Sequence, residues 1–138
     1  MRRIMIGAAV LALAGAARGE FFKIQGAVDF GDFKLVAARL EGLDAKALRE
    51  GVDVLKQKLT DAVVLLAGAQ GGKVALVAGV AGKAGGVIKA GELVSMVAAR
   101  IGGKGGGRPD MAQGGGDDGP ALIEAVGDVR RWIEEKRA

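Results

Sequence analysis

The residues best suited to chemistry lie in one glycine-rich run, residues 102–116, which reads GGKGGGRPDMAQGGG. Two cations stand among glycines whose bare backbone can approach a ligand closely. Backbone amides and cations together hold anions such as phosphate in many proteins. We therefore expect this run to form an anion-binding loop between two helices. Its expected donors are Lys104, Arg108 and the amides of Gly105, Gly106 and Gly107.

The composition excludes most catalytic chemistry. The chain has no cysteine and no histidine, which rules out a thiolate nucleophile, an imidazole base and an ordinary zinc site. Its one serine, Ser95, and its one threonine, Thr60, have no sequence neighbour that would activate a hydroxyl group. We therefore expect no catalytic centre, no metal and no cofactor in these 138 residues.

Positive charge is concentrated in residues 73–108, although the net charge of the whole chain is only +4. This segment contains one acid, Glu92, and six cations: Lys73, Lys83, Lys89, Arg100, Lys104 and Arg108. Such a distribution indicates a site for a polyanion, and the alternative is a set of scattered, solvated side chains. Outside the glycine run, Lys89 and Arg100 are the candidate contacts. Arg100 would also stabilise the end of a helix through the helix dipole.

A strand followed by a helix is predicted at residues 33–59. Residues 33–40 are apolar on both alternating faces apart from two cations, as in a strand covered on two sides. Asp44 is placed to cap the helix. Apolar residues then recur at steps of four, three and four, which predicts one buried face made of Leu48, Val52, Leu55 and Leu59. The charged residues between them are expected to face water.

Two further apolar runs of strand length, residues 62–69 and 73–80, are separated only by Gln70, Gly71 and Gly72. A short connection rich in glycine predicts an antiparallel hairpin. The preceding strand, helix and strand predict a right-handed crossover with both strands in one sheet. The expected fold class is therefore α/β, with a small mixed sheet packed against helices.

Helices are predicted on both sides of the glycine run. The first covers about residues 90–101 and ends at Gly102. The second begins after two potential caps, Asp117 and Asp118, with a proline in its first turn. Its apolar stripe consists of Leu122, Val126, Val129 and Ile133. Trp132 is expected to pack beside this stripe rather than to stack on a nucleic-acid base.

Residues 1–32 are interpreted as an N-terminal extension. Residues 1–18 have the basic start, the uncharged stretch and the small-residue end of a secretory signal. The alternatives are an alanine-rich helix, as the remnant of a helical subdomain, and a truncated start. Residues 21–32 are expected to form short strands around a glycine break, with their phenylalanines packed on the sheet.

Three sequences lie upstream of or overlap GGKGGGRPDMAQGGG, in this order: KLVAARLEGLDAKALREGVDVLKQKL, VALVAGV and KAGELVSMVAARIGGKGGG. In these four sequences and their order, residues 33–138 resemble the C-terminal, DHHA1-type domain of alanyl-tRNA synthetase. The related module of single-strand nucleases and oligonucleotide phosphoesterases usually has a histidine after its glycine run, where this chain has Arg108. The resemblance implies a DHHA1-like fold and a tRNA-binding domain over residues 33–138.

The resemblance also implies a function, namely binding of the outer corner, or elbow, of an alanine-specific tRNA in support of alanylation and editing. The candidate nucleic-acid contacts are Lys104, Gly105, Gly106, Gly107, Arg108, Met111, Gln113, Arg100 and Lys89. Met111 would lie against an exposed base, and the turn at Pro109 would hold it there. Asp110 is expected to close the loop by accepting hydrogen bonds from backbone amides, and Gln113 is a second candidate for this role.

The implied partners are tRNA and the remaining synthetase domains, in the cytoplasm and away from membranes. Self-association in the family depends partly on helices that this chain lacks, so we do not expect a homo-oligomer from these residues alone. Two other functions stay open. One is the nucleic-acid-binding half of a DHH-type phosphoesterase, whose metal ligands would lie on another domain. The other is a protein-interaction domain with a merely flexible glycine run.

Overall fold

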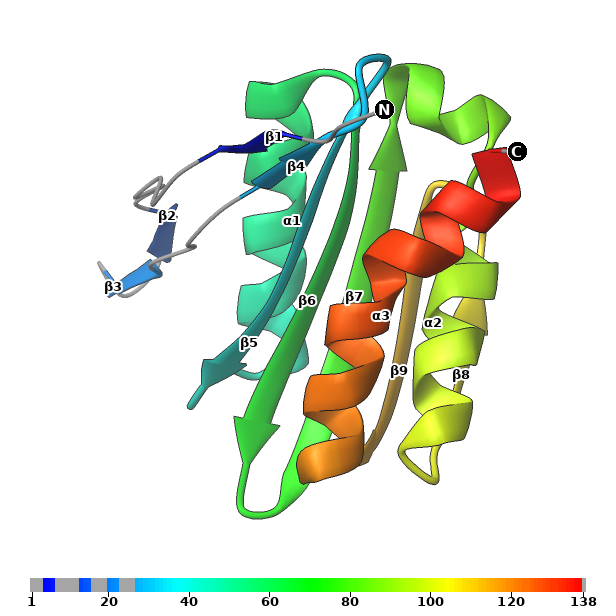
Figure 1. Cartoon of the computed structure of the whole chain (residues 1–138). Helices are drawn as coiled ribbons and strands as arrows, with labels where there is room; N and C mark the ends of the chain where they lie inside the picture. The colour runs from blue at the N-terminus through cyan, green and yellow to red at the C-terminus, as the bar shows by residue number, and fades with distance from the viewer. Residues whose placement is uncertain (1–3, 7–12, 16–19, 23–26, 138) are drawn as a thin grey trace.

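The computed structural model describes residues 4–6, 13–15, 20–22 and 27–137 of the chain. In this described part the central feature is a mixed sheet of seven strands, in the order β1-β4-β5-β6-β7-β9-β8 (Figure 1). The strands are β1 (Ile4–Ile6), β4 (Ala27–Asp29), β5 (Lys34–Glu41), β6 (Ala62–Gln70), β7 (Lys73–Ala81), β8 (Lys104–Gly107) and β9 (Met111–Asp117). Strands β5 and β6 are parallel, and the other neighbouring pairs are antiparallel. A separate antiparallel pair is formed by β2 (Leu13–Gly15) and β3 (Glu20–Phe22).

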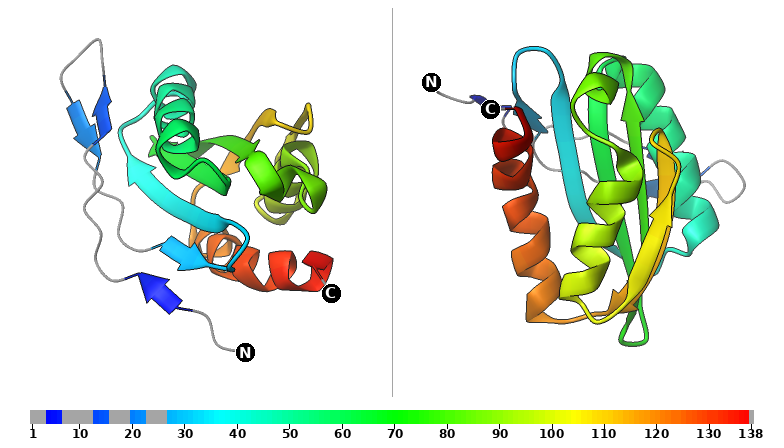
Figure 2. Two further views of the ribbon diagram at one scale, coloured as in Figure 1. Left: turned by 90° about the horizontal axis from the view of Figure 1, so that it is seen from above. Right: turned by 90° about the vertical axis from the view of Figure 1, so that its right-hand side faces the viewer.

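Helices cover both faces of the sheet. Helix α1 (Ala45–Leu59) packs on one face, while α2 (Ala90–Arg100) and α3 (Pro120–Arg137) lie side by side on the other (Figure 2). A short 3-10 helix, η1 (Gly82–Gly86), joins β7 to the chain leading into α2. Because helices lie on both sides, β6 is covered on both faces, and its residues from Ala62 to Ala69 are all buried. The predicted α/β fold is therefore confirmed.

The predicted crossover and hairpin are both present. Strand β5, helix α1 and strand β6 form a parallel crossover unit, and Gly71 and Gly72 turn β6 into the antiparallel β7. Asp44 caps α1 as predicted, because its carboxylate accepts a hydrogen bond from the amide of Ala47 at 2.9 Å. Leu48 and Val52 belong to the apolar face of α1 and are fully buried.

The glycine run is not a loop, and this prediction was wrong. Its two halves form β8 and β9, an antiparallel hairpin at the edge of the sheet. The glycines serve close packing. A Cβ atom on Gly91 of α2 would lie 2.8 Å from the carbonyl oxygen of Gly107, so helix and strand touch almost backbone to backbone. A strand without side chains shows no alternation of apolar and polar residues, which is why the sequence pattern concealed it.

The C-terminal end of α2 was predicted correctly, whereas the residue that precedes the first turn of α3 was not. Gly102, at φ 73°, ends α2 as expected, and the amide of Gly103 donates to the carbonyl of Ala98 at 2.8 Å. Helix α3 starts at Pro120, so Gly119 precedes it where an aspartate cap was predicted. The two aspartates pair with cations instead.

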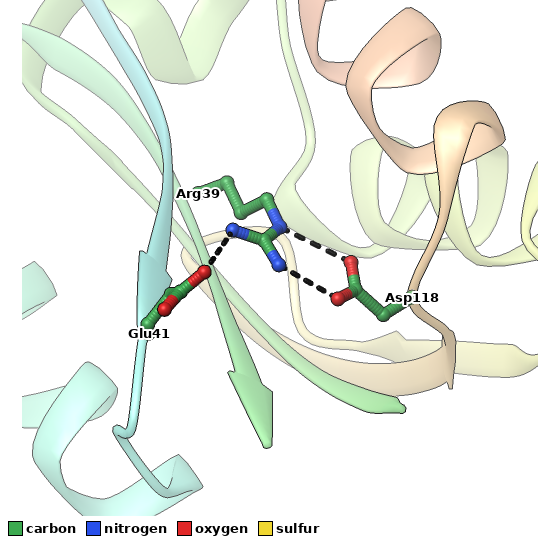
Figure 3. Close-up of polar contacts among 3 residues, drawn as sticks. All are labelled: Arg39, Glu41 and Asp118. Carbon is green, nitrogen blue, oxygen red and sulfur yellow. Dashed lines mark hydrogen bonds and ion pairs between the residues drawn. The ribbon is translucent and has the colours of Figure 1, made fainter. Parts of the chain in front are cut away.

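These ion pairs tie the start of α3 to the sheet. Asp117 accepts a hydrogen bond from Lys73 at 2.7 Å. Asp118 accepts two from the guanidinium of Arg39 on β5, at 3.1 and 2.7 Å, and Arg39 also donates to Glu41 at 3.0 Å (Figure 3). The bidentate geometry fixes the orientation of both side chains.

The predictions for the N-terminal extension are tested only in part. The interpretations of residues 1–18 rest mostly on positions outside the described ranges, and the boundary at residue 33 stays a prediction. Phe30 and Phe33 are buried as expected, with ring centroids 5.4 Å apart. Among the described residues, no helix is long and apolar enough to cross a membrane.

Candidate nucleic-acid interface

The hairpin turn, residues 108–110, is held in place by backbone hydrogen bonds. The amide of Arg108 donates to the carbonyl of Met111 at 3.0 Å, which closes the turn itself. Two neighbouring residues hold it further. The amide of Val80 donates to the carbonyl of Asp110 at 3.0 Å, and the amide of Ala90 donates to the carbonyl of Pro109 at 2.8 Å. The turn is therefore fixed between the end of β7 and the start of α2, and its side chains are free to project.

A groove runs between helix α1 and the hairpin, and we call it the α1-side groove. Its volume is about 600 Å³. The register of β9 against β7 places Gln113 opposite Val77 and Met111 opposite Gly79, on the sheet face that α1 covers. Because α1 lies over β6 and β7, this face of the edge hairpin stays open. The side chains that line it include Arg49, Asp53, Lys56, Arg108, Asp110, Met111 and Gln113.

Three cations and two carboxylates line this groove. When the side-chain amide of Gln113 is oriented with its oxygen toward Arg49, that oxygen accepts hydrogen bonds from Arg49 Nε, at 3.2 Å, and from Arg49 Nη2. Lys56 Nζ donates to the carbonyl of Asp110 at 3.3 Å. Arg108 lies 3.8 Å from the Asp110 carboxylate and keeps 80% of its side chain exposed. Each cation therefore has donors left for a ligand.

A pocket of about 520 Å³ lies on the opposite side of the hairpin, between α2 and α3. We call it the Trp132 pocket. Its apolar walls include Met96, Pro109 and Trp132, and Lys89 and Lys136 stand among its polar residues. Gly106 and Gly107 line both this pocket and the α1-side groove. The hairpin of β8 and β9, residues 104–117, is thus a narrow ridge between two depressions, and we call it the hairpin ridge.

Comparisons with known proteins show the family to which this chain belongs. The profile of the DHHA1 domain family matches residues 32–135. The chain belongs to the DHHA1 domain family. It is 62% identical to the alanine-tRNA ligase of Xanthomonas campestris pv. campestris (strain B100) over 109 residues, which are 79% of this chain and 12% of that protein. It is 63% identical to the alanine-tRNA ligase of Stenotrophomonas maltophilia (strain K279a) over 110 residues, 80% of this chain and 12% of that protein.

A solved structure supports the same assignment. The crystal structure of the C-Ala domain from Aquifex aeolicus alanyl-tRNA synthetase matches this DHHA1 domain with a TM-score of 0.71 and 33% sequence identity. The match covers 78% of this chain and 96% of that domain. The resemblance to the C-terminal domain of alanyl-tRNA synthetase is thereby confirmed. The chain spans 12% of the length of the two alanine-tRNA ligases above.

The predicted contact residues of the DHHA1 domain divide into four groups by their position. Arg108, Met111 and Gln113 meet in the α1-side groove, and Gly106 and Gly107 line both depressions. Lys89 belongs to the Trp132 pocket. The others lie apart from the turn: Gly105 faces α2, Arg100 pairs with Asp128 at 2.9 Å, and Lys104 stands at the far end of β8.

Lys104 and Arg108 do not form one anion site. Strand β8 separates them, and at a strand rise of about 3.3 Å per residue they are about 13 Å apart. Lys104 lies opposite Gly115, on the same sheet face as Gln113. The two cations would therefore meet different phosphates of an extended ligand.

The loop-closing role predicted for the Asp110 side chain was wrong. Its carbonyl accepts hydrogen bonds from the amide of Val80 and from Lys56 Nζ, while its carboxylate lies beside Arg108. Arg49 and Lys56 were missed as site residues because charged positions off the apolar stripe of α1 were assigned to solvent. The signal was present: Arg49, Asp53 and Lys56 recur at helical spacing along one side of α1.

Proposed function

We propose that this DHHA1 domain binds tRNA through the hairpin ridge and contacts the outer corner of the folded molecule. The two relatives described above are named alanine-tRNA ligases, and the matching solved domain comes from alanyl-tRNA synthetase. From those names we infer that the ligand is a tRNA. From the geometry of the hairpin ridge we infer where the tRNA binds.

One observation carries the proposal: the exposed Arg108 stands on a fixed turn, with further cations on both sides of it. Arg49 and Lys56 line the groove on one side, and Lys89 and Lys136 line the pocket on the other. A cationic ridge between two depressions suits a bulky, shaped polyanion better than a single small anion, because separate phosphates can meet separate cations.

The proposed contacts follow from this geometry. Arg108 and the α1-side cations would neutralise phosphates near the turn, and Lys104 would meet a phosphate farther along the backbone. Strand β8 lies at the edge of the described sheet, so one side of its backbone has no strand partner. Gln113 orients Arg49 through the hydrogen bonds described above. Met111, half-buried beneath the groove, offers an apolar contact to a base or ribose.

The cellular role that we propose is that of a tRNA-binding module for alanylation and editing, which other synthetase domains would carry out. This assignment extends beyond the 12% of the ligase length that the chain covers. Specificity for alanine tRNA and a cytoplasmic location belong to the same proposal, since both follow from the proposed role in charging tRNA.

Filter binding with folded tRNA and with an unstructured RNA of equal length tests the proposal. We expect tighter binding of the folded tRNA. If four to six phosphates are neutralised, the logarithm of affinity should fall with the logarithm of salt concentration at a slope of about −3 to −5. Equal binding of both RNAs, or binding independent of salt, would contradict the proposal.

A further inference from the structure

The Trp132 pocket carries features that phosphate binding does not use. Helices α2 and α3 lie side by side (Figure 2). Residues of both helices and of the hairpin ridge line the pocket. Trp132 is half-buried and packs against the main core while it also lines the pocket. Met96 and Pro109 extend this apolar surface. A flat aromatic surface in an open pocket suits a planar ring.

Polar groups around this surface have hydrogen-bonding capacity that no other group of the described residues uses. Within residues 28–137, neither the indole N–H of Trp132 nor the ammonium of Lys89 has a hydrogen-bond or ion-pair partner. The Ser95 hydroxyl donates to the carbonyl of Gly105 at 2.9 Å and keeps lone pairs free to accept. An apolar ligand would satisfy none of these groups.

Lys136 occupies the position over the aromatic ring in the free protein. Its Nζ lies 5.3 Å from the ring centroid of Trp132 and 3.5 Å from the carboxylate of Glu92. Both members of this ion pair are exposed, at 42% and 49%, so the contact is weak and the long side chain can move away. An incoming ring can therefore take its place while the ammonium remains close.

We propose that the Trp132 pocket binds one unpaired nucleotide of RNA. Its base would lie against Trp132 and Met96, and its phosphate would meet Lys89 and Lys136. A nucleotide has a feature to match each group of the pocket. Its base has a flat aromatic face and ring acceptors for the indole N–H, and its phosphate carries a negative charge for the two ammonium groups. The inference rests on the proposed function, because it assumes that RNA reaches the hairpin ridge.

The intrinsic fluorescence of the chain reports on this pocket alone, since Trp132 is the only tryptophan and there is no tyrosine. Titration of the full chain with folded tRNA should quench this emission, with half-saturation at the concentration that filter binding gives. AMP should quench it only at far higher concentration. Tight binding of AMP would assign the pocket to a free nucleotide and overturn the RNA proposal.

Substitution of Trp132 by leucine, W132L, removes the stacking surface but keeps an apolar side chain. We expect it to weaken tRNA binding about tenfold or more without changing the salt slope, because stacking is not ionic. The control R131A, an exposed cation on the same helix outside the pocket, should leave affinity within about twofold. Circular dichroism checks that W132L is folded.

If W132L fails to fold, the double variant K89Q/K136Q keeps the tryptophan and still tests the pocket. It should reduce both the affinity for tRNA and the extent of quenching. Tight, salt-dependent tRNA binding with unchanged Trp132 emission would overturn this inference and leave the proposed function standing. Absence of any tRNA binding would overturn both.

Discussion

Gly105 of β8 lies directly beneath Val94 of α2, so closely that a Cβ atom on this glycine would stand 2.5 Å from Val94 Cγ1. The same methyl group lies over Gly114, the cross-strand partner of Gly105, where an added Cβ would be 2.7 Å away. The two glycines have no side chains, so Val94 of α2 packs directly on their backbone. This contact sets the distance between the helix and the candidate RNA-binding hairpin.

Replacing Gly105 by alanine should therefore destabilise the domain. The added methyl group meets the Val94 side chain and also the Cα of Gly114 at 2.8 Å, so backbone as well as side chain must shift. We expect a loss of about 1–3 kcal/mol in the free energy of unfolding. Gly106→Ala is the matched control, because its Cβ would meet only Ser95 Oγ at 3.9 Å. Urea unfolding of both variants measures the difference, and equal stabilities would contradict this account of the packing.

The sequence was most informative where side chains repeat. The apolar stripe around Leu48 and Val52 and the cap Asp44 predicted α1 closely, and the glycine pair at residues 71–72 predicted the hairpin of β6 and β7. The second hairpin was missed because its strands consist largely of glycine. A strand pattern requires side chains that alternate between the two faces, and glycine provides none.

The candidate site was predicted only in part. Arg108, Met111 and Gln113 line one groove because they are close together in the chain, and their role as nucleic-acid contacts stays a prediction. The contribution of Arg49 and Lys56 depends on the register of β9 against β7, which leaves one face of the edge hairpin open beside α1. No pattern within a single segment reveals that register. Trp132 was expected only to pack, and it both packs and lines a pocket.

The ion pair between Arg39 and Asp118 should make stability depend on pH. Hydrogen bonds from Arg39 lower the pKa of the Asp118 carboxyl below its ordinary value of 3.8, against a smaller opposing effect of partial burial. A carboxyl with a lowered pKa in the folded state stabilises the protein above about pH 4. That contribution is lost as the pH falls further and the carboxylate is protonated.

Asp118→Asn tests this directly, because asparagine keeps the shape but not the charge. The variant should be less stable than the natural protein at pH 7, and the difference should shrink between pH 5 and pH 3. Thermal unfolding at several pH values gives the comparison. A gap that stays constant over this range would show that the charge of Asp118 contributes nothing to stability.

Thr60 adopts a backbone conformation that glycine would adopt more easily. Its φ is 67° and its ψ is −57°, and the amide of Asp61 donates to the carbonyl of Leu59 at 2.6 Å, which is the geometry of the strained γ-turn. Thr60→Gly should relieve this strain and raise the free energy of unfolding by about 1 kcal/mol after the entropic cost of glycine. Chemical denaturation measures this change in the free energy of unfolding, and Thr60→Ala is the control that keeps the strained backbone conformation.

Helix α1 should contribute to RNA affinity through two side chains. Arg49→Ala and Lys56→Ala each remove one cation from the α1-side groove, and each should weaken tRNA binding about two- to tenfold at moderate salt. Lys58→Ala is the matched control, since Lys58 is exposed on the same helix but does not line the groove. Filter binding of the three variants distinguishes a local contact from a general effect of net charge. Equal losses in all three would contradict the assignment of the groove.

The most direct test of the central claim is the salt dependence of tRNA binding in Arg108→Ala, compared with the natural protein and with Lys58→Ala. If Arg108 on the hairpin ridge neutralises a phosphate, its removal should make the log–log slope shallower by about 0.7–0.9, while Lys58→Ala leaves the slope unchanged. Identical slopes for all three proteins would show that the ridge does not contact the tRNA backbone.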